Sequence, residues 1–544
     1  MIAALLAQAA SPAVEVSRTP LIVVVCYLAL LVGLGLASTR FFRGTSADYF
    51  IASRSIGPFL LLMTIFGTTM TSFALVGSTA KTFDKGIGVY GLMASWSGLV
   101  HSACFYLVGI RLWAIGKRYG YLTQVQYFRD RFQSDALGYL LFPILVALVI
   151  PYLLTGLIGA AATIRGVTTG MFPELFPETA GAVPPWLTSL VISCVVLCYV
   201  FFGGIRGTTW ANAFQTLLFM VTGVLAFFMI ARALGGAAAA TAKVAQYAPD
   251  HLQREGMFGQ GEFFSYAFIP LSVAMFPHVF QHWLTARSAR SFRLSVIAHP
   301  VCILIVWIPT VLIGMWAAGL VGAGELSVPN SNAVLGRMVD QFVDSPVLTG
   351  LLTAGILAAI MSTLDSQFVC LGTMFTNDVV IHATGRDRFT DGQKLWIGRA
   401  FTVAVGALTY VLSLFPPPHI FSLGVWCFTG FSGLFPLVFA SLYWKRITRA
   451  GAVASILVTA VCWFVLFADA VLFPQMRLFG SSGDGEYLVL GFMPVVIVVV
   501  LSSAALVVVS LMTKPLPDSV VDRFFEDGAR TSVPAVSVSR GSSA

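Results

Sequence analysis

Thirteen stretches of predominantly apolar residues, most of them about 20 residues long, run through this chain of 544 residues. They cover residues 20–38, 55–80, 86–110, 136–165, 185–203, 208–234, 262–287, 295–320, 348–375, 396–415, 419–442, 451–473 and 487–512. A helix of about 20 apolar residues crosses the hydrocarbon core of a bilayer. Open strands cannot satisfy their backbone groups in lipid. The sequence therefore predicts an all-α polytopic membrane protein with about 13 transmembrane helices.

The composition excludes several other classes of protein. Hydrophobic residues make up 57% of the chain, and Asp, Glu, Lys and Arg together only 10%, against about a quarter in average soluble domains. So few charges cannot cover the surface of a soluble enzyme, a nucleic-acid binder or a disordered chain. We expect the lipid bilayer as the surrounding partner, no nucleic acid, and no obligate protein partner.

The basic residues predict the orientation of the chain. When the loops are placed alternately on two sides, more than two thirds of the 32 lysines and arginines fall on one side. That side is cytoplasmic by the positive-inside rule. We expect a short outer segment (1–19), a transmembrane domain (20–512) and a cytoplasmic tail (513–544), in the bacterial inner (plasma) membrane.

Two spans are interrupted by residues that break helices. The second contains Gly67-Thr68-Thr69-Met70-Thr71-Ser72, and the seventh contains Met275-Phe276-Pro277-His278. Interrupted spans at matching positions of two halves are typical of transporters with inverted repeats. The five-span separation predicts a 5+5 inverted repeat with broken first helices, over about 55–234 and 262–442. The alternative is a pair of ordinary kinks.

A third polar segment, Ser362-Thr363-Leu364-Asp365-Ser366-Gln367, lies in the middle of the ninth span. Sodium is a hard cation that binds oxygen. Ser362 and Thr363 offer adjacent hydroxyls, and carbonyls freed at Gly67 could supply further ligands. Asp365 is a candidate coupling acid, because a carboxylate inside a membrane is a functional candidate by default. Alternatively, these hydroxyls only bond to their own helix or join helices.

Four segments in this order resemble the solute–sodium symporter family. They begin at Tyr49 (YFIASRSIGP), Gly203 (GGIRGTTWANAFQ), Met361 (MSTLDS) and Tyr443 (YWKRITRAGA). The likeness covers roughly residues 20–510 and implies the leucine-transporter architecture. It also implies a sodium site made by the carbonyls of Gly67, Met70 and Ala359 and the hydroxyls of Ser362 and Thr363. No other metal and no cofactor are expected.

The same resemblance implies a sodium-coupled symporter of a small organic solute, and not an enzyme. The solute should bind beside the ion; the candidate lining residues are Thr68, Thr71, Tyr152, Thr155, His278 and Gln281. The segments Pro151-Tyr152 and Gly120-Tyr121-Leu122-Thr123 resemble bacterial monocarboxylate members of the family. A carboxylate would suit the positive ends of broken helices.

Two positions depart from the family pattern. Asn212 stands where the family signature usually has an acid, and Thr69 stands where some members have one. Both departures leave proton coupling open. A sensor that keeps the transporter fold is the other alternative.

Overall fold

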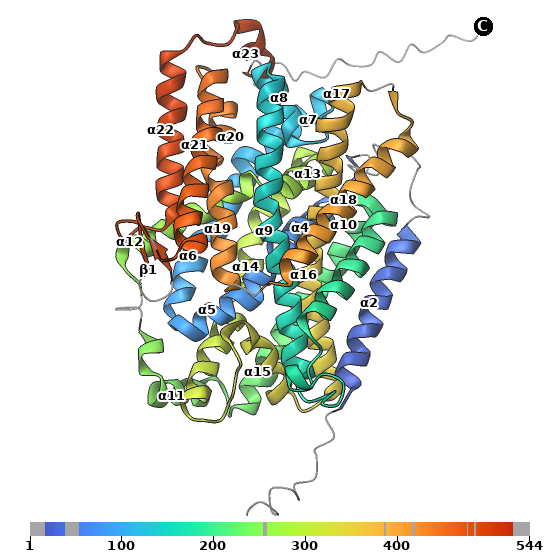
Figure 1. Cartoon of the computed structure of the whole chain (residues 1–544), viewed down its shortest axis with the longest axis vertical. Coiled ribbons are helices and arrows are strands. Elements are labelled where there is room, and N and C mark those ends of the chain that lie inside the picture. The colour runs from blue at the N-terminus through green and yellow to red at the C-terminus, as the bar shows by residue number, and fades with distance from the viewer. Residues whose placement is uncertain are drawn as a thin grey trace, which may run out of the picture.

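Long apolar helices dominate the computed structural model, which describes residues 17–38, 54–253, 258–385, 388–415, 419–475, 477–482 and 486–525. The helices pack side by side into an elongated bundle (Figure 1). Ten of them are long and apolar enough to cross a membrane: α2 (Thr19–Ser38), α6 to α7 (Gly88–Tyr119), α9 (Asp135–Thr168), α10 (Pro185–Ala233), η8 and α14 (Ala289–Gly322), α16 to α17 (Pro346–Thr384), α18 (Asp391–Ser413), α19 and α20 (Ile420–Tyr443), α21 and η12 (Arg449–Leu472), and α22 (Pro494–Met512).

Two further spans are bent pairs of helices. Helix α4 (Pro58–Thr69) and the segment of η3 and α5 (Phe73–Lys85) meet at 58°. The segment of α12 and η7 (Gln260–Ala274) and helix α13 (Pro277–Thr285) meet at 50°. These breaks lie where the sequence predicts them. The all-α membrane fold is confirmed.

The predicted count of thirteen spans is not confirmed, since the described helices give ten spans, or up to twelve if each bent pair is one span. The difference lies in α10, where the sequence predicts two spans and the structure has one helical run of 49 residues. Gly204 interrupts this run with a non-helical backbone (φ 53°, ψ −160°), which a glycine tolerates.

The chain turns sharply at Gly204. Tyr199 and Asn212 precede and follow it and would lie ~20 Å apart along a straight helix. Nevertheless the Tyr199 hydroxyl donates to Asp365 Oδ2 at 3.1 Å, and the Asn212 amide, turned so that its nitrogen faces the carboxylate, donates to the same oxygen at 2.9 Å. The two halves of α10 therefore lie side by side against α16.

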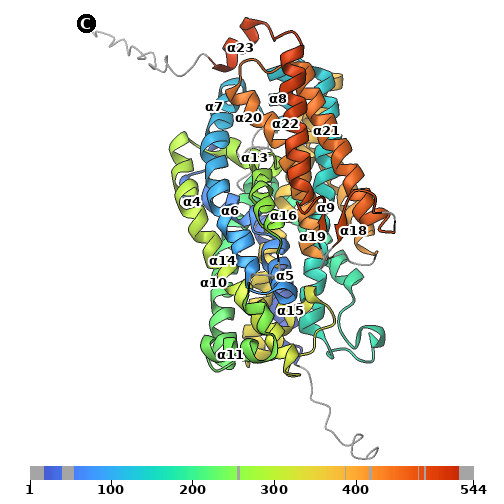
Figure 2. The same cartoon turned by 90° about the vertical axis from the view of Figure 1, so that its left-hand side faces the viewer.

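Shorter elements close the two ends of the bundle. Helices α8 (Gln124–Phe132) and α23 (Asp518–Phe525) lie at one end, which we call the tail end, and α11 (Ala237–Tyr247) and α15 (Val334–Phe342) lie at the other (Figures 1 and 2). The remaining short elements are η5 (Pro177–Thr179), η6 (Pro249–Leu252), η9 (Ser331–Ala333) and the hairpin of β1 (Ser481–Ser482) and β2 (Tyr487–Leu488).

Part of the predicted tail is a docked helix. In α23, Val521 is buried, Arg523 pairs with Asp130 of α8 at 3.0 Å, and the Tyr119 hydroxyl donates to the Arg523 carbonyl at 2.7 Å. Residues 526–544 and 1–16 lie outside the described part of the chain, so the predicted ends are described only in part. The predicted repeat boundaries stay predictions.

Helix α16 (Pro346–Met374) is central to the bundle. In its most apolar window 83% of the residues are buried, against 33% in α2, α18, α21 and α22. It packs against α2, α4, α9, α10, α13 and α18. Polar side chains on α16 are therefore enclosed by protein on nearly every side.

Candidate functional site

The first break exposes backbone carbonyls inside the bundle. Helix α4 ends at Thr69, and Met70 leaves the helical conformation (φ −92°, ψ 87°). The last four carbonyls of a helix have no intrahelical donor in regular geometry. Gly67 and Thr68 lie in this last turn and are buried. Gly67 also permits close packing, because an added Cβ would overlap the Thr216 hydroxyl.

The second break is made by Pro277. This residue stands at the first position of α13, where its missing N–H costs nothing and its fixed φ favours a helix start. Phe276 precedes the helix with an extended backbone (φ −62°, ψ 118°). The first-turn N–H groups of His278 and Val279 therefore have no acceptor within the helix, at the end that carries its partial positive charge.

The hydroxyls of α16 meet the carbonyls at the end of α4. Ser362 Oγ donates to the carbonyls of Gly67 and Ala359, each at 2.9 Å. Thr363 Oγ1 lies 3.2 Å from the Thr68 carbonyl and 3.5 Å from that of Ala359. Four of the five residues predicted as sodium ligands are thus neighbours, and the Thr68 carbonyl joins them.

Met70, the fifth predicted ligand, occupies the break itself. Its N–H donates to the Phe66 carbonyl at 3.0 Å, and the residue is buried. The described residues contain no group of three or more His, Cys, Asp or Glu side chains that could hold a metal ion.

Asp365 lies within a buried polar network beside these hydroxyls. Besides Tyr199 and Asn212, the hydroxyl of the adjacent residue Ser366 donates to this carboxylate, at 3.1 Å from Oδ1. The same hydroxyl lies 3.0 Å from His282 Nε2 and 3.2 Å from the Ser362 carbonyl. The partners that the structure gives to this carboxylate are all uncharged, and they link it to Ser362.

Two of the candidate solute residues, Tyr152 and His278, lie in an aromatic cluster with Phe276 and Phe428. The rings of Tyr152, Phe276 and Phe428 lie 5.1 to 5.5 Å apart. The His278 ring lies 5.3 Å from Phe276 and 5.8 Å from Tyr152. A small cavity of about 30 Å³ borders this cluster. The aromatic side chains close the space between the two breaks.

The other predicted lining residues have varied surroundings. Thr71 accepts from the Phe73 N–H at 2.9 Å, and Thr155 donates to the Tyr152 carbonyl at 2.7 Å. Thr68 is fully buried, and its hydroxyl has no partner among the described residues. The Gln281 amide donates to Thr373 at 2.9 Å, which turns it away from the aromatic cluster.

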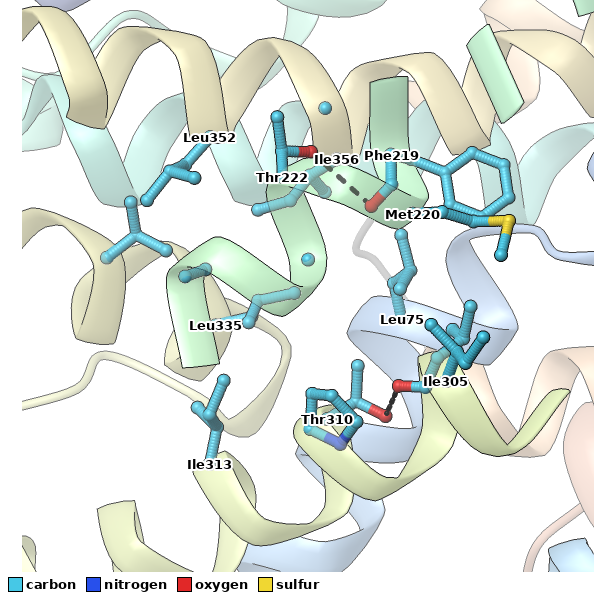
Figure 3. A pocket seen from close by; sticks show the side chains of 16 residues that line it. Leu75, Phe219, Met220, Thr222, Ile305, Thr310, Ile313, Leu335, Leu352 and Ile356 are labelled. Atoms are coloured by element: carbon cyan, nitrogen blue, oxygen red, sulfur yellow. Dashed lines mark hydrogen bonds between the residues drawn. The ribbon is translucent and has the colours of Figure 1, made fainter. Parts of the chain in front are cut away.

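A separate cavity of about 30 Å³ lies among α10, α14, α15 and α16 (Figure 3). Its lining is mostly Leu, Ile, Val and Phe side chains. The two threonine hydroxyls at its wall, Thr222 and Thr310, donate to carbonyls of their own helices. We interpret it as a packing gap between helices and not as part of the candidate site.

Comparison with known proteins identifies relatives over most of the chain. Residues 49–459 match the family model described as "Sodium:solute symporter family". The sodium/proline symporter of Salmonella typhimurium is 26% identical over 499 residues, which cover 88% of this chain and 94% of the relative. The sodium/pantothenate symporter of Escherichia coli is 23% identical over 459 residues, covering 81% and 89%.

Solved structures share the fold. A Na⁺-coupled sialic acid symporter matches with a TM-score of 0.69 and 18% identity, covering 92% of this chain and 99% of that one. A transporter of the nucleobase-cation-symport-1 family matches with a TM-score of 0.51 and 13% identity, covering 88% and 97%. These structural matches confirm a transporter fold. The family match and the curated relatives point to a transporter rather than an enzyme. The chain belongs to the sodium:solute symporter family.

Proposed function

We propose that this protein is a sodium-coupled symporter that carries a small, carboxylate-bearing organic solute across the plasma membrane. Family membership supports sodium coupling and gives no support to the proton-coupled alternative. The relatives are named for proline and pantothenate, and both solutes carry a carboxylate. The narrower expectation of a monocarboxylate transporter has no such support.

The observation that carries the proposal is the meeting of the α16 hydroxyls with the α4 carbonyls. Ser362, Thr363, Gly67 and Ala359 contribute oxygens that lie within 3.5 Å of one another in pairs. Sodium would replace the hydrogen bonds between them, since each hydroxyl can turn a lone pair toward the ion. Met70 would add a carbonyl at the break. These are uncharged oxygens, which suit a monovalent hard cation.

Asp365 is proposed to act as the coupling acid. It lies one helical turn from Ser362, and the Ser366 hydroxyl bridges the two residues. A buried carboxylate without a charged partner is costly. A cation bound nearby lowers the cost of burying this charge. The carboxylate therefore favours binding of sodium at the adjacent site. Asn212, which replaces the usual acid of the family, donates to Asp365 and supports it.

The solute is proposed to bind between the two breaks, beside Thr68, Thr71, Tyr152, Thr155 and His278. The aromatic cluster would contact the apolar part of the solute, and the positive end of α13 would face its carboxylate. Gln281, which bonds to Thr373, would contact the solute only on its way toward the tail end.

The tail end is proposed to face the cytoplasm. Its loops and α8 carry most of the basic residues, including Arg129 and Arg131, which is the distribution expected of a cytoplasmic face. The amino terminus would then lie outside.

A thermal-shift screen tests this function. Purified protein is heated with L-proline, pantothenate, lactate, a sugar or no solute, in sodium or potassium buffer. We expect one carboxylate to raise the unfolding temperature in sodium and much less in potassium, because a ligand that binds the native state stabilises it. Equal stabilisation in the two salts would contradict sodium coupling.

A further inference from the structure

Gln367 is a buried side chain that the account above does not use. It is fully buried in α16, and neither Nε2 nor Oε1 has a hydrogen-bond partner among the described residues. A buried amide without partners destabilises the folded protein through both its N–H donors and its oxygen acceptor. Buried polar side chains in proteins are normally hydrogen-bonded. Such a side chain suggests a ligand that supplies the missing bonds.

His278 has the same property on the neighbouring helix. Its side chain is 1% exposed, and both ring nitrogens lack a partner in the described structure. It stands in the first turn of α13, a helix of nine residues, where backbone N–H groups also lack intrahelical acceptors. Ring nitrogens without a partner and backbone N–H groups without an intrahelical acceptor therefore occur together at this helix end.

The packing brings Gln367 to the level of His278. Leu364 of α16 packs against Gly156 of α9, and Gln367 follows Leu364 by about one turn in the direction of the tail end. Tyr152 precedes Gly156 by one turn in that same direction, and the His278 ring lies 5.8 Å from the Tyr152 ring. The His278 ring thus lies beside Tyr152, and Gln367 lies at the level of Tyr152 along the bundle.

The angular position of Gln367 agrees with this placement. It is four residues beyond Thr363, which contacts α4, and three beyond Leu364, which contacts α9. Since residues three and four apart share a helix face, its side chain is directed between α4 and α9. On the third side, α13 approaches through His282 and Ser366, 3.0 Å apart. Gln367 therefore points into the central space of the bundle.

We propose that Gln367 is a solute-binding residue and that, with His278 and the first turn of α13, it binds the carboxylate of the transported solute. This inference rests on the proposed function. The Gln367 amide and the His278 imidazole each offer an N–H donor, and the α13 backbone adds two more. A carboxylate accepts several hydrogen bonds, whereas a neutral amide or alcohol at the same place offers fewer acceptor sites and no negative charge for the helix end.

Matched pairs of solutes test the assignment: L-proline and L-prolinamide, lactate and lactamide, and pantothenate and panthenol. Each is titrated against purified full-length protein in sodium and in potassium buffer, with the unfolding temperature as the readout. We expect one carboxylate to stabilise the protein and the partner that lacks the carboxylate to do so at least about tenfold more weakly, which corresponds to the loss of one bond to a charged group.

Variants then locate the contact. Gln367→Leu should raise the half-saturating concentration of that carboxylate roughly 10- to 100-fold, and Gln367→Glu should raise it more, by repulsion. His278→Phe should act in the same direction. Gln341→Leu is the matched control, since Gln341 is an exposed residue of α15, at the end of the bundle opposite to the tail end, where its amide donates to the Glu325 carbonyl. Stabilisation by sodium alone should persist in every variant and shows that each is folded.

Two results would overturn the assignment. One is Gln367→Leu binding the carboxylate within twofold of the wild type. The other is a panel in which no carboxylate stabilises the wild type more than the partner that lacks the carboxylate does. Failure of the proposed function has a different signature: the carboxylate binds equally in sodium and potassium. In that case the comparison of Gln367→Leu with the wild type still decides the role of Gln367.

Discussion

Removal of the hydroxyl of Ser362 is the sharpest perturbation of the proposed sodium site. In the structure this hydroxyl bonds to the carbonyls of Gly67 and Ala359 at 2.9 Å, and the residue is fully buried. Ser362→Ala changes only one oxygen and its proton. Thr363→Val removes the second hydroxyl with little change in shape.

The expected magnitude follows from the bonds that are lost. Without sodium, Ser362→Ala loses one neutral hydrogen bond between α16 and α4, about 1 kcal/mol of stability. With sodium, it loses a ligand to a charged group, for which we take the ~1.5–3 kcal/mol of a hydrogen bond to a charge. Since every 1.4 kcal/mol is about tenfold in affinity, sodium should bind roughly 10- to 150-fold more weakly.

A sodium titration followed by thermal unfolding measures this loss. The wild type should gain stability with sodium concentration according to mass action, and Ser362→Ala should need the higher concentration given above. The double variant Ser362→Ala with Thr363→Val should show no sodium-dependent gain and no sodium-stimulated uptake. Thr363→Ser keeps its hydroxyl and is the matched control, with sodium affinity near that of the wild type.

The result that would refute this reasoning is unchanged sodium dependence in the double variant while the protein still reaches the membrane in normal amount. That outcome would mean that the α16 hydroxyls only hold helices together. A loss of protein from the membrane would instead indicate a folding role, which the thermal unfolding of purified protein in potassium measures separately.

Three further predictions concern the surroundings of the site and the topology. Asp365→Asn should weaken sodium binding roughly tenfold or more and uncouple solute uptake from the sodium gradient, measured by uptake in sodium and potassium; uptake with unchanged sodium dependence would exclude Asp365 as the coupling acid. Gly67→Ala should cost about 1–3 kcal/mol of stability by overpacking against Thr216, whereas Gly57→Ala, where an added Cβ meets nothing within 4 Å, should be tolerated; equal unfolding temperatures of the two variants would contradict the close contact. Ser532→Cys, in a chain whose native cysteines are replaced, should react with an impermeant maleimide only after the cells are opened; labelling of intact cells would reverse the proposed orientation.

The sequence predicted the elements that depend on local chemistry. Pro277 and the Gly67–Ser72 segment interrupt their helices for reasons that each short segment contains, so both breaks could be located without a structure. The chemistry of Ser362 and Thr363 already suggested a pairing with carbonyls freed at Gly67, and the family resemblance then specified the set of ligands. The count of thirteen spans is not confirmed: the sequence predicts two spans, one on either side of Gly204, whereas the structure has one helical run over Pro185–Ala233 that turns at this glycine without a loop.

The remaining features depend on contacts between distant segments. Tyr199 and Asn212 reach Asp365 only because α10 folds back on itself, and no helical periodicity predicts that meeting. Gln367 belongs to the polar segment that the sequence analysis singles out, but it was not predicted to bind solute, because its type and position do not reveal whether a partner exists. Only the burial of both amide atoms without a bond distinguishes it from an ordinary polar residue between helices.

Gradient-driven uptake into proteoliposomes tests the central claim most directly. Vesicles containing the purified protein receive radiolabelled L-proline, pantothenate or lactate under an inward sodium gradient, an inward potassium gradient or an inward proton gradient. We expect one carboxylate to accumulate above its external concentration with the sodium gradient alone, and the accumulation to collapse when a sodium ionophore is added. Accumulation driven equally by potassium or protons, or accumulation that survives the ionophore, would contradict sodium-coupled symport.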